Sequence, residues 1–234
     1  MKKFLKIITE LIYPKRCPVC DKTAPFGEKI CPGCREELKI ITSPWCMKCG
    51  RKLEEEGAYC KDCLKKEHRF VCGRSLYEYK SVYGSIYRFK YENRPEYGEF
   101  FGEEMYRNLK SFIDYTKAEG IVPIPLHRKR QRKRGYNQAY LLAKVISEGT
   151  DIPLYPNYLK RVKNTAPLKL LPPAQRQNNL KKAFIVSQNV VKLKSIIVVD
   201  DIYTTGSTMD EAATALLESG VREVFFVTLA GAGI

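Results

Sequence analysis

Long hydrophobic runs are missing from this chain of 234 residues. No stretch approaches the roughly 18 consecutive apolar residues that typify a membrane-spanning helix, so we expect no transmembrane segment. Residues 1–13 come nearest to a secretion signal, but Lys6, Thr9 and Glu10 interrupt their apolar positions, and no small-residue cleavage site follows. The sequence therefore predicts an amphipathic helix at residues 1–13 and a cytoplasmic location.

Acidic residues are in deficit. The chain has 26 Asp and Glu residues against 41 Lys and Arg residues, so its formal net charge is +15. The balanced ion-pair surface of a heat-adapted protein would not leave such an excess of one sign. A surface this basic attracts phosphate-rich partners, so the composition favours nucleic acid, an anionic membrane or nucleotides as ligands.

Large apolar residues are scarce between residues 17 and 63. The same segment contains eight of the nine cysteines as four C-x-x-C pairs: Cys17/Cys20, Cys31/Cys34, Cys46/Cys49 and Cys60/Cys63. Each C-x-x-C turn brings two thiolates to one metal ion, and two such turns complete a tetrahedral four-cysteine zinc site. We predict two structural zinc ions, which would supply much of the folding free energy of this core-poor segment.

The cysteine pattern leaves alternatives for the chemistry and the pairing. A disulfide framework is the rival to zinc, but the sequence shows no secretion signal. Ten residues separate the first pair from the second and the third from the fourth, which favours zinc sites built from neighbouring pairs. A cross-braced arrangement is the alternative. His68, one of only two histidines, has no ligand-like partner, and we expect it at the surface.

A change in composition near residue 70 divides the chain. We predict an N-terminal domain of residues 1–69, which holds the helix and the zinc sites, and a second domain of residues 70–234. Residues 64–69 are expected to form the hinge between them.

The second domain alternates apolar runs with helical patterns. We predict helices at residues 83–91, 100–115, 137–147 and 209–220. The aromatic residues of the first two helices are expected in the core. The final strand is expected to close a sheet whose strands lie near residues 74–79, 120–125, 158–162, 184–186, 196–199 and 223–229.

The stretch from residue 195 to residue 211 carries the clearest chemical pattern. Ile196–Val199 has the composition of a strand buried on both faces, and two carboxylates follow it at once. Because ionised carboxylates only accept hydrogen bonds, the pair suits two vicinal ribose hydroxyls. Ending the strand or binding a metal are the alternative roles of this pair, which is Asp200 and Asp201.

A turn of small residues follows the carboxylates and leads into a helix. A helix N-terminus presents free N–H groups and a positive dipole end to an anion. Glycine in the turn allows the backbone to approach a ligand closely, and the hydroxyl groups add donors for a phosphate. The turn therefore predicts a sugar-phosphate site formed by Thr204, Thr205, Gly206, Ser207 and Thr208.

A dense run of cations lies between the strand at 120–125 and the helix at 137–147. The loops at this place in an α/β sheet bind ligands, and pyrophosphate or a nucleic-acid backbone would relieve the repulsion between the cations. A solvated face is the alternative. The residues are Arg128, Lys129, Arg130, Arg132, Lys133 and Arg134. Beside them, base stacking or hydrogen bonding is predicted for Tyr136, Asn137 and Gln138.

A proline-rich basic segment separates the strands near 158–162 and 184–186. A long loop of this kind over an anion site is typical of a mobile lid. Arg176 lies within it, and we predict that this residue also contacts pyrophosphate or nucleic acid.

The order of these motifs resembles the ComF family of competence proteins. After the C-x-x-C pairs, the resemblance rests on Phe89–Tyr91, Val122–Ala139, Arg176–Phe184 and Ile197–Thr208. The last segment also closely resembles the signature with which type I phosphoribosyltransferases bind phosphoribosyl pyrophosphate (PRPP). The resemblance implies an α/β fold, in which a type I phosphoribosyltransferase-like parallel sheet flanked by helices follows a small double zinc ribbon.

The same resemblance implies ligands and partners. Magnesium-bound PRPP would occupy the site, with Asp200 and Asp201 in the catalytic position. Single-stranded DNA is the expected macromolecular ligand, and DNA-uptake or recombination proteins are possible partners. We expect a PRPP-binding protein that acts in single-stranded DNA uptake or processing, in natural transformation or DNA maintenance. The alternative is an active phosphoribosyltransferase that transfers ribose 5-phosphate to an unidentified acceptor and has no DNA role.

Overall fold

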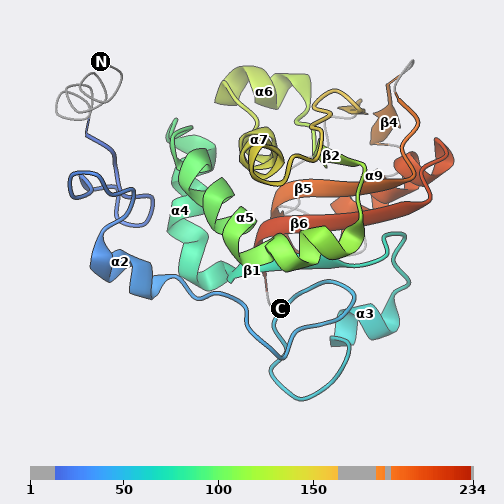
Figure 1. Ribbon diagram of the computed structural model, residues 1–234, viewed down its shortest axis with the longest axis horizontal. Coiled ribbons are helices and arrows are strands. Elements are labelled where there is room, and N and C mark those ends of the chain that lie inside the picture. Colours follow the sequence, from blue (N-terminus) through green and yellow to red (C-terminus); the bar gives the residue numbers. More distant parts are fainter. Residues whose placement is uncertain (1–13, 163–182, 188–190, 233–234) are drawn as a thin grey trace.

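The computed structural model describes residues 14–162, 183–187 and 191–232 (Figure 1). The helix predicted at residues 1–13 and the lid with Arg176 lie outside these ranges. The helices are α2 (Pro32–Glu37), α3 (Lys61–Lys65), α4 (Tyr79–Tyr91), α5 (Tyr97–Thr116), α6 (Arg128–Arg134), α7 (Gln138–Thr150) and α9 (Ser207–Glu218). The strands are β1 (Gly73–Glu78), β2 (Gly120–Pro123), β3 (Leu159–Arg161), β4 (Phe184–Val186), β5 (Ser195–Tyr203) and β6 (Glu223–Gly231). Within the described ranges, every helix is too short or too polar to cross a membrane.

The central sheet contains four parallel strands in the order β1-β6-β5-β2. β3 and β4 form a separate antiparallel hairpin. The prediction that β6 closes the sheet is wrong, because β1 pairs along the outer side of β6, with Gly73 opposite Phe226. β5 lies inside the sheet, between β6 and β2. Asp200 lies opposite Thr228 of β6, whereas β2 ends opposite Val199, just before the acid pair.

The side chains of β5 point alternately to the two faces of the sheet, and each face has its own hydrophobic core. Ile197 and Val199 belong to the buried cluster formed with α4, α5 and α7. Ile196 and Val198 belong to the opposite cluster, which includes apolar residues of α9. Because successive side chains of a strand point to opposite faces, a continuous apolar run suits a strand covered on both sides. This arrangement confirms the parallel sheet flanked by helices.

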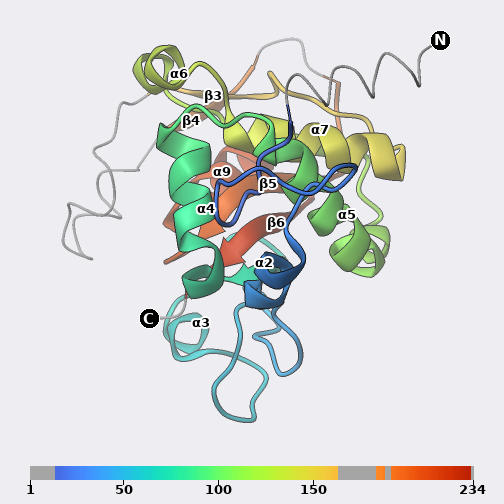
Figure 2. The ribbon, with the colours of Figure 1, turned by 90° about the vertical axis from the view of Figure 1, so that its left-hand side faces the viewer.

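The two halves of the cysteine-rich segment pack against different cores. The first zinc ribbon, residues 17–37, places Ile30 in the cluster with α4 and α5. The second zinc ribbon, residues 46–63, places Leu53 in the cluster with α9. Figures 1 and 2 show α2 of the first ribbon near α4, and α3 of the second ribbon at the β1 side of the sheet. Both ribbons are therefore continuous with the core of the second domain.

The sequence predicted that the aromatic residues of α4 lie in the core. This prediction is wrong for three of the tyrosines. Phe89 is fully buried, whereas Tyr83, Tyr87 and Tyr91 are 48%, 47% and 61% exposed. The reason is helical geometry: these tyrosines repeat every four residues along one side, while the residues buried in the core occupy the other side.

Candidate functional site

Two four-cysteine groups have the geometry of zinc sites. The sulfur atoms within each group all lie within 4.8 Å of one another, and the groups are Cys17/Cys20/Cys31/Cys34 and Cys46/Cys49/Cys60/Cys63. The Cys20–Cys31 and Cys49–Cys60 sulfur distances are 3.9 and 3.8 Å. Tetrahedral zinc with bonds of about 2.3 Å places its sulfur ligands about 3.8 Å apart, so the residues fit the metal. The pairing of neighbouring C-x-x-C motifs is confirmed.

The acid pair lies within β5 rather than after it, because the strand continues to Tyr203. The Asp201 carboxylate forms an ion pair with Lys90 of α4, with 2.7 Å between Oδ2 and Nζ. The Asp200 carboxylate accepts a hydrogen bond of 2.8 Å from the Asp201 backbone N–H. The two neighbouring carboxylates therefore have different surroundings, and only that of Asp201 is paired directly with a cation in the described part of the chain.

Asp200 holds its proton more tightly than an ordinary carboxyl group. Burial raises its pKa to about 7, and the Asp201 charge acts in the same direction. Lys90 and Arg161 oppose the rise. Near neutral pH this carboxyl can therefore exchange a proton or respond to a ligand that donates hydrogen bonds to it.

The turn after β5 ends as the N-cap of α9. Gly206 has φ 75°, and a Cβ there would lie 2.5 Å from the Tyr203 hydroxyl oxygen, so only glycine fits. The hydroxyls of Thr205 and Ser207 lie 3.0 Å apart. Among the residues that the structure describes, no side chain caps α9. Its first-turn N–H groups are thus available to an anion.

A side chain of the second ribbon forms a hydrogen bond to the backbone of this turn. The buried Arg51 donates to the Thr204 carbonyl at 2.6 Å and to Asp62 at 2.9 Å. Its guanidinium lies 5.8 Å from the centre of the Tyr203 ring. A zinc-ribbon side chain therefore fixes the backbone at the first residue of the candidate phosphate turn.

A second contact joins the segment after the second ribbon to α9. His68 Nδ1 lies 3.0 Å from an Asp210 carboxylate oxygen, and Lys66 pairs with the same carboxylate. Although burial opposes it, these hydrogen bonds lower the pKa of Asp210. The expectation of a surface histidine is wrong: His68 is 6% exposed, because Asp210 and the stacked Phe70 ring enclose it.

The basic run forms the helix α6 rather than a loop. Helical spacing spreads the charges around an axis, with His127 as the N-cap that accepts from the Lys129 N–H. Most of its cations reach solvent; the exposed ones are Arg128, Lys129, Arg132 and Lys133. Arg130 and Arg134 are half-buried.

The residues after α6 make hydrogen bonds within the protein. The Tyr136 hydroxyl and the Gln138 amide both donate to the Phe89 carbonyl, at 2.6 and 2.9 Å. The Asn137 side chain caps α7 and donates to the Ile124 carbonyl. Their contact with bases stays a prediction, and the observed role of these side chains is to join α7 to α4 and to the end of β2.

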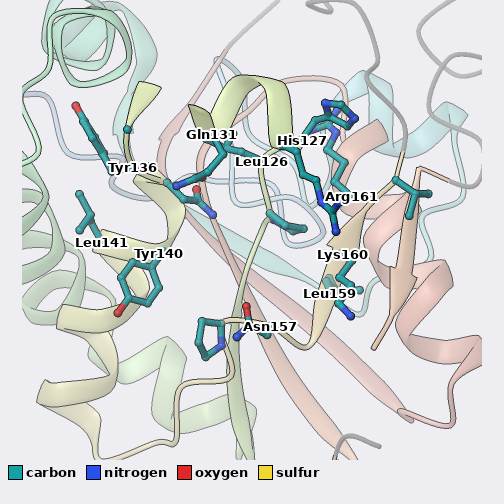
Figure 3. A pocket seen from close by; sticks show the side chains of 16 residues that line it. Leu126, His127, Gln131, Tyr136, Tyr140, Leu141, Asn157, Leu159, Lys160 and Arg161 are labelled. Carbon is teal, nitrogen blue, oxygen red and sulfur yellow. The ribbon is translucent and has the colours of Figure 1, made fainter. Parts of the chain in front are cut away.

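A cavity of about 870 Å³ opens beside α6. The β2–α6 connection, the start of α7 and strand β3 line it, with Tyr136 and Tyr140 toward one side and His127 and Arg161 toward the other (Figure 3). The volume lies in the range of about 300–1,000 Å³ that is typical of small-molecule sites.

Arg161 links this cavity to the acid pair. Burial lowers its pKa to about 10, the charge of Arg130 adds to the effect, and the charge of Asp200 opposes it. The predicted residues therefore form two groups, one around β5 and α9 and one around α6. The charges of Arg130 in the second group and of Asp200 in the first both affect the pKa of Arg161.

Sequence reasoning assigned no site role to Lys90, Arg51 or Arg161. Lys90 lies within the aromatic segment Phe89–Tyr91, and the only sequence feature that could have indicated a site role is its charge between two aromatic residues. Arg51 offered none, because its partner Thr204 lies 153 positions further along the chain. These contacts exist only through the packing of distant segments.

Comparison with known proteins supports both parts of this description. The model of the double zinc ribbon domain matches residues 8–64, and that of the phosphoribosyl transferase domain matches residues 137–233. Competence protein F of Haemophilus influenzae is 36% identical over 89% of this chain and 93% of its own length. Competence protein ComFC of Bacillus subtilis is 33% identical over 82% of this chain and 80% of its own length. DNA utilization protein YhgH of Escherichia coli K12 is 27% identical over 92% of this chain and 96% of its own length.

Proposed function

Because the chain belongs to the ComF family of competence proteins, we propose that it binds PRPP or a related phosphosugar and acts in the uptake and processing of single-stranded DNA. The observation that carries this proposal is the 36% identity to a competence protein over 89% of the chain. The uncapped helix N-terminus and the acid pair support the phosphosugar part, and the basic helix α6 supports the DNA part.

The phosphosugar would lie across the end of β5 and the start of α9. Its 5-phosphate would accept hydrogen bonds from the turn at Thr204–Thr208, and its ribose hydroxyls would donate to Asp200 and Asp201. Magnesium would arrive with the pyrophosphate group, since this ion is usually held by one or two carboxylates together with substrate phosphates. The half-buried Arg130 and Arg161, with Arg176 of the lid segment, are the cations that we assign to pyrophosphate.

Single-stranded DNA would follow the exposed side of α6. Its phosphates would be held by the exposed cations of that helix, and this binding would be independent of sequence. Cysteines held as zinc thiolates suit a reducing compartment, so we place this activity in the cytoplasm. DNA-uptake or recombination proteins would act with it there.

An active phosphoribosyltransferase is the second candidate function, and the cavity beside Arg161 favours it by offering room for an acceptor. In that reaction the bond from ribose C1 to pyrophosphate breaks, pyrophosphate leaves, and the acceptor nucleophile bonds to C1. Measuring pyrophosphate release from PRPP, with and without single-stranded DNA, distinguishes turnover from binding alone.

We predict that Asp200→Asn combined with Asp201→Asn weakens PRPP binding at least tenfold, because amides present donors where the ribose hydroxyls need acceptors. Titration calorimetry with magnesium and PRPP measures the affinity. Asp114→Asn is the matched control, because this carboxylate is exposed on α5 and pairs only with Lys110 among the described residues. Unchanged PRPP affinity in a folded double variant would remove the site assignment.

A further inference from the structure

Helix α4 carries a row of tyrosines along its exposed side. Tyr79, Tyr83, Tyr87 and Tyr91 repeat every four residues, and we call them the tyrosine stripe. The ring centres of Tyr79 and Tyr83 lie 5.6 Å apart, and those of Tyr87 and Tyr91 lie 5.1 Å apart. The rings thus contact one another in two pairs, and the last three are about half exposed or more.

Tyr79 packs partly against the core, whereas Tyr83, Tyr87 and Tyr91 are about half exposed or more. The buried residues of α4 lie on its opposite side, and they are Val82, Ser85, Ile86 and Phe89. A contiguous set of exposed large aromatic rings on a protein surface commonly marks a binding site. Tyrosine suits that role, because its ring stacks on a partner while its hydroxyl stays in water.

Cations surround the stripe. The Arg134 guanidinium at the end of α6 lies 5.2 Å from the centre of the Tyr91 ring. The exposed Lys80 lies near the other end of α4, whereas Arg88 and Lys90 in the last turn of α4 contact the Val19 carbonyl and Asp201. Figure 2 shows α4 running along one side of the molecule, with α6 beyond its end. The contact between Arg134 and Tyr91 therefore joins the stripe to α6, and this combination of rings and cations would attract an anionic polymer with aromatic groups.

We infer that the tyrosine stripe stacks the bases of single-stranded nucleic acid whose phosphates are held by α6 and Lys80. Four residues of helix advance about 6 Å, so successive rings are spaced more widely than the ~3.4 Å of one strand in a duplex. That spacing requires an extended single strand with unstacked bases. The inference rests on the proposed DNA binding and names the second half of that site.

The test compares ring removal with charge removal in the full chain. Tyr83→Ala, Tyr87→Ala and Tyr91→Ala should each lower the affinity for an oligonucleotide about fivefold or more, since losing one base–aromatic stack typically costs about 1–3 kcal/mol of binding free energy. The corresponding Tyr→Phe variants should bind normally because they keep the ring. Tyr115→Ala is the matched control, because it removes a tyrosine that is 69% exposed on α5.

Two further measurements separate stacking from phosphate binding. The Tyr→Ala variants should keep the wild-type dependence on salt, because they remove no phosphate contact. An oligonucleotide with abasic positions should bind the wild-type protein and the variants equally weakly. Photo-cross-linking to DNA that contains 5-iodouracil should label the tryptic peptides 81–88 and 91–107.

The outcomes are distinguishable. If the Tyr→Ala variants bind DNA as the wild type does while variants of α6 bind weakly, DNA binding stands and the stripe inference is overturned. If the wild-type protein binds no single-stranded nucleic acid, the proposed function fails with it. If the Tyr→Ala variants change only the oligomeric state, the stripe is a contact between copies of the chain, and the inference is likewise overturned.

Discussion

At the scale of single residues, Asp200 links the site to protein stability. Its pKa in the folded protein is about 7, above the 3.8 of an ordinary aspartate. The folded state therefore binds this proton more tightly than the unfolded state does, and stability falls as the pH rises from about 4 to about 7. Above pH 7 the folded protein carries the full cost of an enclosed carboxylate beside Asp201.

We predict that Asp200→Asn raises stability at pH 8, because the amide has the shape of the carboxyl group without its charge. The expected gain is about 1 kcal/mol or more, which corresponds to about 2–4 °C in Tm for a chain of this size. The gain should be smaller at pH 5.5, where the wild-type carboxyl is already protonated. Thermal unfolding followed by circular dichroism at both pH values measures it, and equal Tm values at pH 8 would refute the enclosed-charge explanation.

At the scale of elements, the second ribbon holds the candidate phosphate turn. Arg51 fixes the Thr204 carbonyl, while Lys66 and His68 fix Asp210 in the first turn of α9. The turn is therefore positioned by a zinc-dependent unit that is distant in sequence. The first ribbon makes a similar contact elsewhere, since its Arg35 pairs with Glu104 of α5.

We predict that Arg51→Ala weakens PRPP binding about tenfold, because the turn loses its support. Arg35→Ala is the control: it removes an arginine from the first ribbon and should leave PRPP affinity unchanged. Metal analysis should find two zinc ions per chain in the wild type and both variants, which shows that the ribbons remain folded. Equal PRPP affinity of the two variants would mean that the second ribbon does not position the turn.

At the scale of the whole molecule, the net charge of +15 favours polyanionic ligands, and α6 carries six cations in seven residues. The Arg134 guanidinium of α6 lies over the Tyr91 ring of the tyrosine stripe, whereas burial, with the charge of the half-buried Arg130, lowers the pKa of Arg161. The exposed cations of α6 thus differ in burial from Arg130. DNA phosphates could therefore contact the exposed cations while pyrophosphate contacts Arg130.

We predict that DNA binding weakens with salt along a log–log slope of roughly −3 to −4, from about four to six phosphate contacts at about 0.7 each. Replacing the exposed Arg128, Arg132 and Lys133 by glutamine should lower affinity and flatten the slope by about 2. Fluorescence anisotropy with a labelled oligonucleotide measures both quantities.

The control for this charge removal takes three cations from other exposed helix surfaces: Arg107, Lys110 and Lys144. Their replacement by glutamine lowers the net charge equally and should leave the slope near the wild-type value. If both triple variants behave alike, binding follows net charge rather than α6. A separate titration of PRPP into the DNA complex shows whether the two ligands compete for the cations of α6.

The sequence alone determined the features that depend on local order. The zinc ligands follow from the C-x-x-C spacing, which also favoured the pairing of neighbouring motifs, and the parallel strand β5 follows from the apolar run before Asp200. The four predicted helices correspond to α4, α5, α7 and α9, because apolar residues at helical spacing mark a buried side wherever the helix packs. The basic run of α6 has no such apolar side and was predicted as a loop. The turn at Gly206 was readable because glycine is required at its positive φ.

Only the tertiary structure decided which chemical groups meet. Lys90 reaches Asp201, Arg51 reaches Thr204 and His68 reaches Asp210 across long separations in the chain. It also decided that the tyrosines of α4 face solvent, since amphipathic tyrosine suits a core and a surface equally. Local propensity depends on neighbours in sequence, whereas pairing and burial depend on which faces the folded chain brings together, and that choice is made by the whole core at once.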